Sequence, residues 1–331
     1  AEVACRQASF EQVAEWLWTG VAQVDAPVFE ATAEILTVAR VAAGALPEGT
    51  RPVERLRLAA VGAAVGDPLR FDLRPQAVAA AGQRIIAMLV DSLPLVGSLP
   101  LVDSGPLIGS PDPPPSGRPE AAPIAERLWL RLSAEPPTPE RVKALNGALV
   151  LLADHEMASS TLAARVAAST WADPYLVVSA GLATAGGPLH GGASDRLVGL
   201  LADAAALGAP QALAGRWRLG EVVGGFGHVV YAGRDPRAEA LWALLQEAWP
   251  RHGILQATAA LVEAVTAHDD SRPNVDLMLA ALVSTADMIE GAGETIFAVA
   301  RTAGWLGHAI EEYAHRLRFR FRAVYTGPAP A

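Results

Sequence analysis

The stretch Gly186-Gly187-Pro188-Leu189-His190-Gly191-Gly192-Ala193 places one histidine between a Gly-Gly-Pro and a Gly-Gly sequence, at the end of a long apolar run. Glycine allows the backbone to approach a ligand closely and to adopt φ values that other residues avoid, and proline fixes φ on the approach. A histidine of a hydrophobic core needs no such surroundings. The pattern therefore predicts that His190 is presented to a ligand.

Composition and charge narrow the class of protein. The chain has 331 residues, of which 51% are hydrophobic and 18% charged, so it can bury the core of one large domain or two modest ones. The formal net charge is −9 and no basic cluster with interleaved aromatic residues occurs, which argues against a nucleic-acid partner. Cys5 is the single cysteine, so there is neither a disulfide framework nor a cysteine zinc site.

Targeting signals are not evident in the sequence. The N-terminus lacks the basic, apolar and small-residue regions of a signal peptide. The longest apolar run, Tyr175 to Leu189, is too short and too rich in glycine for a membrane span. We therefore expect a soluble, cytoplasmic protein.

Helical signals recur along the chain. Ser9-Phe10-Glu11-Gln12 is a capping box, and Thr138-Pro139-Glu140 combines a capping side chain, proline at the first helical position and an acid in the first turn. Strand alternation is scarce, and only residues 318–324 could form a short strand. The sequence predicts an all-α fold.

The helical pattern is interrupted between residues 94 and 120, where proline and glycine are too dense for a regular element. We expect an irregular surface loop here. Because the segment also carries leucines and valines that are costly to expose, a docked hydrophobic arm is the alternative.

Four residues lie in settings that suggest chemistry. His155 stands in Asp-His-Glu, His190 in the stretch quoted above, His228 at the end of the glycine-rich loop Gly224–Gly227, and Asp276 beside a helix start marked by Pro273. No His-Glu-x-x-His or cysteine pattern indicates a metal, and no Gly-x-Ser-x-Gly elbow indicates a serine nucleophile. What remains is acid–base chemistry on a carbon or carbonyl, with arginines holding an anionic substrate.

Structural explanations compete with these assignments. His155, taken alone, is also typical of a histidine that bridges two helices, and Asp276 of an acid that favours a helix N-terminus. Arg301 lies in an otherwise apolar helix and needs a partner if it is buried, which a structural carboxylate could equally supply.

Five segments in the same order and spacing resemble the citrate synthase family, over nearly the whole chain. They are Asp154-His155-Glu156 with Ser160-Thr161; Gly187 to Ala193; Gly225 to Tyr231 with Asp235-Pro236-Arg237; Arg272 to Asp276; and Ala300-Arg301-Thr302-Ala303-Gly304-Trp305.

The resemblance implies a catalytic role for three residues. Asp276 would remove a methyl proton from an acyl-CoA thioester. His190 would hydrogen-bond the thioester oxygen and stabilise the enol or enolate, and His228 would polarise the oxaloacetate carbonyl. The implied reaction joins acetyl-CoA, oxaloacetate and water to give citrate and CoA.

It also implies the binding residues. Oxaloacetate would be held by His155, Arg237 and Arg301, together with Arg320 from the partner subunit of a homodimer. CoA would lie against the loop that contains Val223, Gly225, Phe226 and Gly227, as a cosubstrate and not as a permanently bound cofactor. No metal is implied.

The fold implied by the resemblance has two helical domains. The larger would comprise residues 1–190 and 290–331, with the irregular 94–120 segment within it. The smaller would comprise residues 191–289, with His190 at the hinge. Most family members have further residues before Ser9, and whether this chain lacks an N-terminal piece stays open.

The sequence departs from the family pattern at four positions. Ala158 and Ser194 stand where asparagine is usual, Phe321 where proline separates two arginines, and Ala232 where a basic residue often meets CoA phosphate, a role that Arg234 could take over. Two alternatives therefore stay open. One is a 2-methylcitrate synthase that uses propionyl-CoA, and the other is a catalytically weak binding or regulatory protein with the same fold.

Overall fold

The computed structural model describes residues 1–96, 122–187, 190–231, 233–317 and 319–327. Most of the expected 94–120 loop lies outside these ranges. Within them the regular structure is helical, with three isolated β-bridges and no strand, so the all-α prediction is confirmed. Residues 319–324, where a short strand was the alternative, form none.

The described helices are joined by connections that range from a few residues to the long segment between α5 and α6. In chain order they are α1 (Ala4–Gln7), α2 (Phe10–Thr19), α3 (Ala33–Gly44), α4 (Pro52–Ala63), η1 (Ala64–Gly66), α5 (Pro75–Asp91), α6 (Ile124–Leu132), α7 (Pro139–Leu152), α8 (Ser159–Ser169), α9 (Pro174–Ala185), α10 (Ala193–Leu207), α11 (Ala209–Arg218), α12 (Pro236–Ala248), α13 (Gly253–Asp269), α14 (Val275–Thr285) and α15 (Ala292–Glu312).

The helix starts that the sequence indicates are present. The Ser9 side chain accepts from the Gln12 amide while the Gln12 side chain accepts from the Ser9 amide, which completes the capping box. Thr138 caps α7 by accepting from the Arg141 amide, with Pro139 at the first helical position. Each cap satisfies a backbone donor that would otherwise have no partner.

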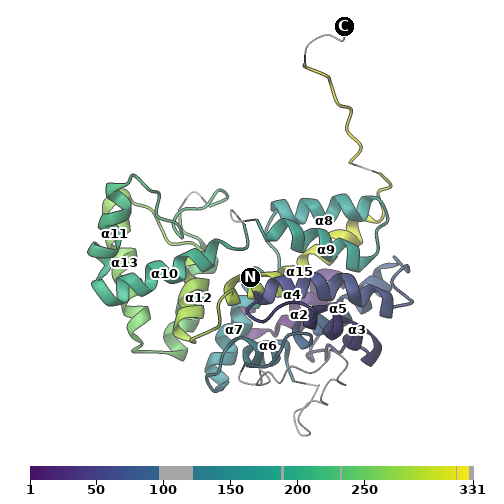
Figure 1. Ribbon diagram of the computed structural model, residues 1–331, viewed down its shortest axis with the longest axis horizontal. Coiled ribbons are helices and arrows are strands. Elements are labelled where there is room, and N and C mark those ends of the chain that lie inside the picture. The colour runs from purple at the N-terminus through teal and green to yellow at the C-terminus, as the bar shows by residue number, and fades with distance from the viewer. Residues whose placement is uncertain (97–121, 188–189, 232, 318, 328–331) are drawn as a thin grey trace.

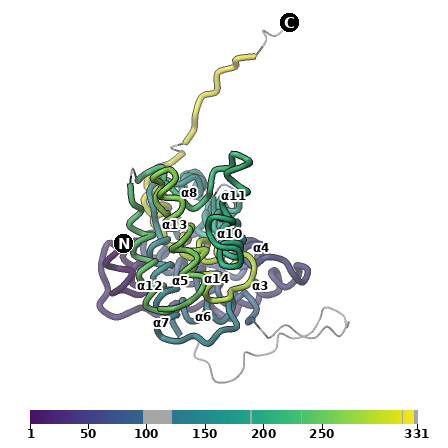
Figure 2. Tube along the Cα trace, turned by 90° about the vertical axis from the view of Figure 1, so that its left-hand side faces the viewer, coloured from purple at the N-terminus to yellow at the C-terminus, as the bar shows by residue number. Residues whose placement is uncertain are grey.

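The helix α15 forms the centre of the larger group of helices. It is 21 residues long, almost wholly buried, and packs against α2, α5, α7, α8 and α9. Figure 1 shows these helices together on one side, with α10, α11, α12 and α13 gathered at the other end. Figure 2, seen from that end, shows the second group in front of the first. The 191–289 boundaries of a smaller domain stay a prediction.

Residues 286–291 connect α14 to α15 and are tied to the end of α6. The Ile289 amide donates to the Leu132 carbonyl at 2.8 Å, and the Ser133 hydroxyl donates to the Ala286 carbonyl at 2.6 Å. Because α14 packs mainly against α10, α12 and α13, this connection to α15 is one of the links between the two groups, besides the packing of α12 on α7.

The C-terminal residues leave the body of the molecule. Residues 319–327 are extended, and Figure 1 shows them projecting away from α8 and α15. Phe321, Val324 and Tyr325 are exposed along this segment. No helix of the described residues has the length and apolarity to cross a membrane.

Candidate active site

The predicted site residues come from five separate segments. His155 lies between α7 and α8, His190 between α9 and α10, His228 between α11 and α12, Asp276 in the first turn of α14, and Arg301 midway along α15.

His155 and His228 meet around a tyrosine. Their rings pack edge to face with centroids 5.1 Å apart, and the His155 Nε2 lies 3.0 Å from the Tyr231 hydroxyl. Burial, Arg237, His228 and Arg301 lower the pKa of His155 to about 4, so it is neutral near pH 7. Tyr231 lies within the quoted motif, but the sequence carried no signal that its side chain joins the two histidines.

The protonation of the His228 ring follows from one backbone contact. The Val230 amide donates to the His228 Nδ1 at 3.0 Å. An amide can only donate, so Nδ1 is the acceptor and the proton of the neutral ring sits on Nε2. Burial and the nearby Arg237 lower the pKa of His228. His228 therefore offers a neutral N–H donor.

His190 is held by a buried serine. The His190 Nε2 lies 2.8 Å from the Ser160 Oγ, which also accepts from the Trp305 indole at 3.2 Å. The indole N–H can only donate, so the Ser160 hydroxyl accepts from Trp305 and can donate its own proton to the His190 Nε2. This arrangement favours the His190 tautomer that carries its proton on Nδ1. Burial and then Arg301 lower the pKa of His190. No pattern in the sequence indicated that Ser160 and Trp305 orient the histidine.

Arg301 links these groups electrostatically. Its side chain is buried, donates from Nε to the Leu152 carbonyl at 2.8 Å and lies 4.9 Å from the centroid of the Phe297 ring. Burial lowers its pKa to about 10, while Asp154 and Asp276 partly offset that effect. Its charge acts in turn on the pKa of His155, His190 and Asp276, so all three lie within electrostatic reach of Arg301.

The Asp276 helix is anchored to Asp235. The Asp235 carboxylate accepts from the Val275 amide at 3.0 Å and binds Arg237 through both oxygens, at 3.0 and 2.9 Å. The Asn274 side chain caps the helix by accepting from the Asp276 amide. Burial raises the pKa of Asp276, and Asp235 adds to this effect while Arg237 and Arg301 oppose it. A buried carboxylate with a raised pKa is a stronger base than one in water.

The glycine-rich loop before His228 is fastened to the same helix start. The Gly227 amide donates to the Arg272 carbonyl at 2.8 Å, and the Asn274 amide donates to the Gly225 carbonyl at 2.9 Å. Gly225 and Gly227 have φ of 84° and 73°, which other residues rarely adopt. Val223 is buried, and Phe226 pairs with Pro273 across an isolated bridge. The loop and Asp276 therefore form one unit.

Arg320 is the predicted site residue that lies apart from the others within this chain. It is exposed in the extended C-terminal segment. Since the expectation placed it in the site of a partner subunit, that role stays a prediction. Ala232 lies outside the described residues. Ala158 immediately precedes α8, at the N-cap position, where it offers no capping side chain. The described residues hold no group of three or more histidine, cysteine or acidic side chains suited to a metal ion.

Comparison with solved structures identifies the class of fold. The structure matches citrate synthase from Pyrobaculum aerophilum with a TM-score of 0.78 and 23% identity, over 100% of this chain and 86% of that chain. It matches the ternary complex of Thermoplasma acidophilum citrate synthase with carboxymethyl-coenzyme A and oxaloacetate with a TM-score of 0.74 and 24% identity, over 98% and 87% of the two chains. The fold is the all-helical citrate synthase fold.

Sequence comparison identifies the family. The profile described as "Citrate synthase, C-terminal domain" matches residues 1–322, and the chain belongs to the citrate synthase family. It is 35% identical to citrate synthase 2 of Bacillus subtilis over 209 residues, which is 62% of this chain and 56% of that protein. The chain spans between half and two-thirds of the length of the first curated relatives it matches.

Proposed function

We propose that this protein condenses acetyl-CoA with oxaloacetate and water to give citrate and CoA. The observations that carry the proposal are a carboxylate of raised pKa, Asp276, and a neutral histidine, His190, both in the field of Arg301, together with a second neutral histidine, His228, in the field of Arg237. A thioester methyl group is a very weak carbon acid, so its deprotonation needs both a strong base and a donor for the developing oxyanion.

In the proposed reaction Asp276 takes a methyl proton from acetyl-CoA. His190 donates from Nδ1 to the thioester oxygen, where negative charge develops, while Ser160 and Trp305 keep that ring in place. His228 donates from Nε2 to the keto oxygen of oxaloacetate and makes its carbon electrophilic. The carbon–carbon bond then forms, and water cleaves the thioester to release CoA.

The positive charges would bind the two carboxylates of oxaloacetate. Arg237 lies near both His155 and His228, and Arg301 lies near His155; both rings are neutral and able to accept or donate hydrogen bonds. Arginine suits this task because its planar guanidinium matches a carboxylate. In the proposed homodimer, Arg320 of the partner subunit adds a further guanidinium. The 223–227 loop would bind CoA.

Release of CoA from acetyl-CoA, recorded with and without oxaloacetate, tests the proposal. We expect oxaloacetate-dependent release that Asp276→Asn reduces by about 10²–10⁴-fold, because the base is removed. Glu140→Gln is the matched control, since Glu140 is also an acid in the first turn of a helix but is exposed. Absence of turnover in a folded native chain would instead support a binding or regulatory protein.

The acyl chain is tested in the same assay with propionyl-CoA. One methylene in a hydrophobic pocket changes the ratio of kcat/KM for two substrates by only about 10–200-fold, or 1–3 kcal/mol. The shape of the acyl pocket, and not the catalytic residues, therefore decides between acetyl-CoA and propionyl-CoA. We expect a higher kcat/KM with acetyl-CoA. A strong preference for propionyl-CoA would make the enzyme a 2-methylcitrate synthase and leave the roles of Asp276, His190 and His228 unchanged.

A further inference from the structure

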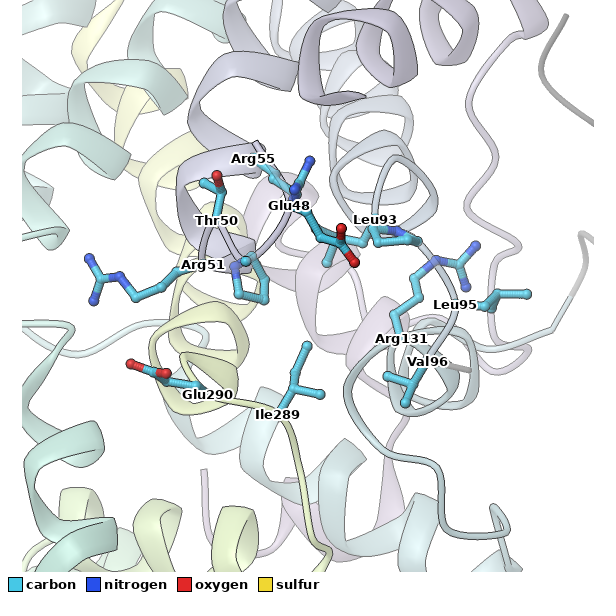
Figure 3. Close-up of a pocket in the computed structure, with 13 residues that line it drawn as sticks. Glu48, Thr50, Arg51, Arg55, Leu93, Leu95, Val96, Arg131, Ile289 and Glu290 are labelled. Atoms are coloured by element: carbon cyan, nitrogen blue, oxygen red, sulfur yellow. The ribbon is translucent and has the colours of Figure 1, made fainter. Parts of the chain in front are cut away.

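A cavity of about 310 Å³, whose lining includes none of the predicted site residues, lies where α4 begins and α5 and α6 end (Figure 3). Residues 93–96, which follow α5, form one side of it, and Ile289 and Glu290 of the α14–α15 connection form another. Its size is at the lower end of the range of ligand pockets, which suits a metabolite of few atoms.

The cavity has a cationic wall. Arg131, at the end of α6, is 11% exposed and pairs with Asp91 at 3.0 Å. The same carboxylate also holds Arg127, so one acid serves two buried guanidiniums. Arg55 donates to the carbonyls of Ala43 and Pro47, which carry no formal charge to balance its own. Among the lining residues, three arginines, Arg51, Arg55 and Arg131, stand against two acids, Glu48 and Glu290.

One donor on this wall is unsatisfied. Among the described residues, the buried Nε of Arg131 has no hydrogen-bond partner. Burial and the charges of Arg127 and Arg40 lower the pKa of Arg131 to about 10, against the opposing effect of Asp91. A buried unpaired donor costs about 1–3 kcal/mol, and more when it is charged, so a rotation of the Arg131 side chain that brings this donor to an anion in the cavity would be stabilising.

Apolar side chains also line the cavity, and Figure 3 shows Leu93 and Val96 beside Arg131, with Ile289 at the lower edge. Pro52 adds to them and places the start of α4, which has no capping side chain, at the edge of the cavity. Glu48 and Glu290 are the acids among the lining residues. The cationic and apolar side chains together suit a ligand with a negative head and a hydrocarbon body.

The cavity also touches the connection between the two catalytic helices. Arg131 immediately precedes Leu132 and Ser133, whose polar atoms bond to Ile289 and Ala286. Asp276 lies on α14 before this connection and Arg301 on α15 after it. A ligand between Arg131 and Ile289 therefore contacts both sides of the bonds that hold the connection.

We propose that this cavity is a second ligand site, for a small organic anion with a carboxylate or phosphate head and a hydrocarbon body, and that its occupancy stabilises the 286–291 connection. The cavity is separate from the proposed catalytic site, and binding there does not depend on the reaction. Binding and stabilisation are coupled, so a ligand that prefers the hydrogen-bonded connection makes its opening rarer.

Calorimetric titration of the full chain tests the binding. Phenyl phosphate and phenylacetate carry the same aromatic ring with a phosphate or a carboxylate, so they distinguish the two anionic groups. Inorganic phosphate is the anion without a hydrocarbon part, and 2-phenylethanol is the hydrocarbon part without a charge. We expect one of the two aromatic anions to bind with Kd of about 1 mM or lower and the neutral alcohol to bind at least about tenfold more weakly. No saturable binding of either aromatic anion would overturn the proposal.

Two variants with opposite expected effects locate the bound probe. Arg131→Met should weaken binding by about tenfold or more, because a charge-assisted hydrogen bond is lost. Glu48→Gln should tighten it, because a like charge leaves the cavity, and Glu48 is exposed, so the fold is not at risk. Arg6→Met is the matched control, since Arg6 pairs with Glu247 on a distant surface. Unchanged affinity in both cavity variants would place the probe elsewhere and overturn the proposal.

Hydrogen exchange measures the effect on the connection. With the bound probe, the Ile289 amide, which donates to Leu132, should exchange more slowly than in the free chain. The effect should be absent in Arg131→Met. Because neither readout needs turnover, a chain without synthase activity still tests this site. Equal exchange with and without the bound probe would overturn the coupling to 286–291.

Discussion

At the scale of single residues, the site depends on histidines that are kept neutral. Burial and nearby arginines lower the pKa of His155, His190 and His228, and to about 4 for His155. A neutral imidazole can donate a hydrogen bond at one nitrogen and accept at the other, so each ring can hold both a partner and a substrate.

The pKa of His155 predicts a pH dependence of stability. Between pH 6.5 and pH 4 the unfolded chain binds a proton at this residue that the folded chain does not, so the stability falls as pH falls through this window. We expect the Tm of His155→Gln to fall by less than the Tm of the native chain when the pH is lowered from 7 to 5. Thermal unfolding at both values measures this, and equal losses would contradict it.

Ser160 is expected to act through His190. Ser160→Ala removes the hydroxyl that joins the His190 ring to the Trp305 indole. By analogy with other groups that orient a functional histidine, we expect kcat to fall by about 10–100-fold, with a smaller change in the KM for oxaloacetate. Steady-state kinetics of the folded variant measure both, and a loss confined to KM would contradict the positioning role.

At the scale of elements, α15 approaches the His155 segment too closely for any side chain at Gly304. A Cβ there would lie 2.4 Å from the Ala153 carbonyl oxygen and 2.7 Å from the Asp154 Oδ1. Gly304 also donates its amide to Ala153 at 3.0 Å, so the two segments cannot separate without losing that bond. The glycine therefore sets the position of His155 relative to Arg301.

We expect Gly304→Ala to destabilise the fold by about 1–3 kcal/mol, as overpacked sites do, and to lower activity because the His155 segment shifts. Gly199→Ala in α10 is the matched control, because a Cβ at Gly199 would meet nothing within 4 Å and alanine favours a helix by about 0.5–1 kcal/mol. Denaturant unfolding compares the two. A Gly304→Ala variant as stable as the native chain would contradict the close approach.

At the scale of the whole molecule, the C-terminal segment suits a role outside its own chain. It projects from the body with Arg320, Phe321 and Tyr325 exposed (Figure 1). Exposed aromatic side chains on an extended segment are typical of a surface that a partner covers. We propose that this partner is a second copy of the chain.

Mixed dimers test this arrangement. Arg320→Ala and Asp276→Asn should each be inactive or weak alone, but an equal mixture that exchanges subunits should recover about a quarter of native activity, because half of its dimers contain one intact site. Sedimentation should show a dimer in each sample. No recovery in a mixture that has exchanged subunits would place Arg320 outside the partner's site.

Much of the fold was predictable because its signals are local. Ser9 and Thr138 act on amides three residues away, and helical periodicity needs only neighbouring turns. The motifs also indicated His155, His190, His228, Asp276 and Arg301. The sequence did not assign roles to Tyr231, Ser160 and Trp305. Tyr231 contacts His155 and Ser160 contacts His190, each far apart along the chain, and Trp305 acts on His190 only through Ser160, so only the fold brings these groups together.

The sequence by itself therefore determined the all-helical class, the family resemblance and the residue types available for acid–base chemistry, since these depend on composition, periodicity and short motifs. The tertiary structure alone decided that His228 offers its proton at Nε2, that the contacts of His190 favour a proton on Nδ1, that burial raises the pKa of Asp276 and lowers that of Arg301, and that Arg131 faces a cavity with Ile289. Those properties depend on distances between separate elements, which no local pattern encodes.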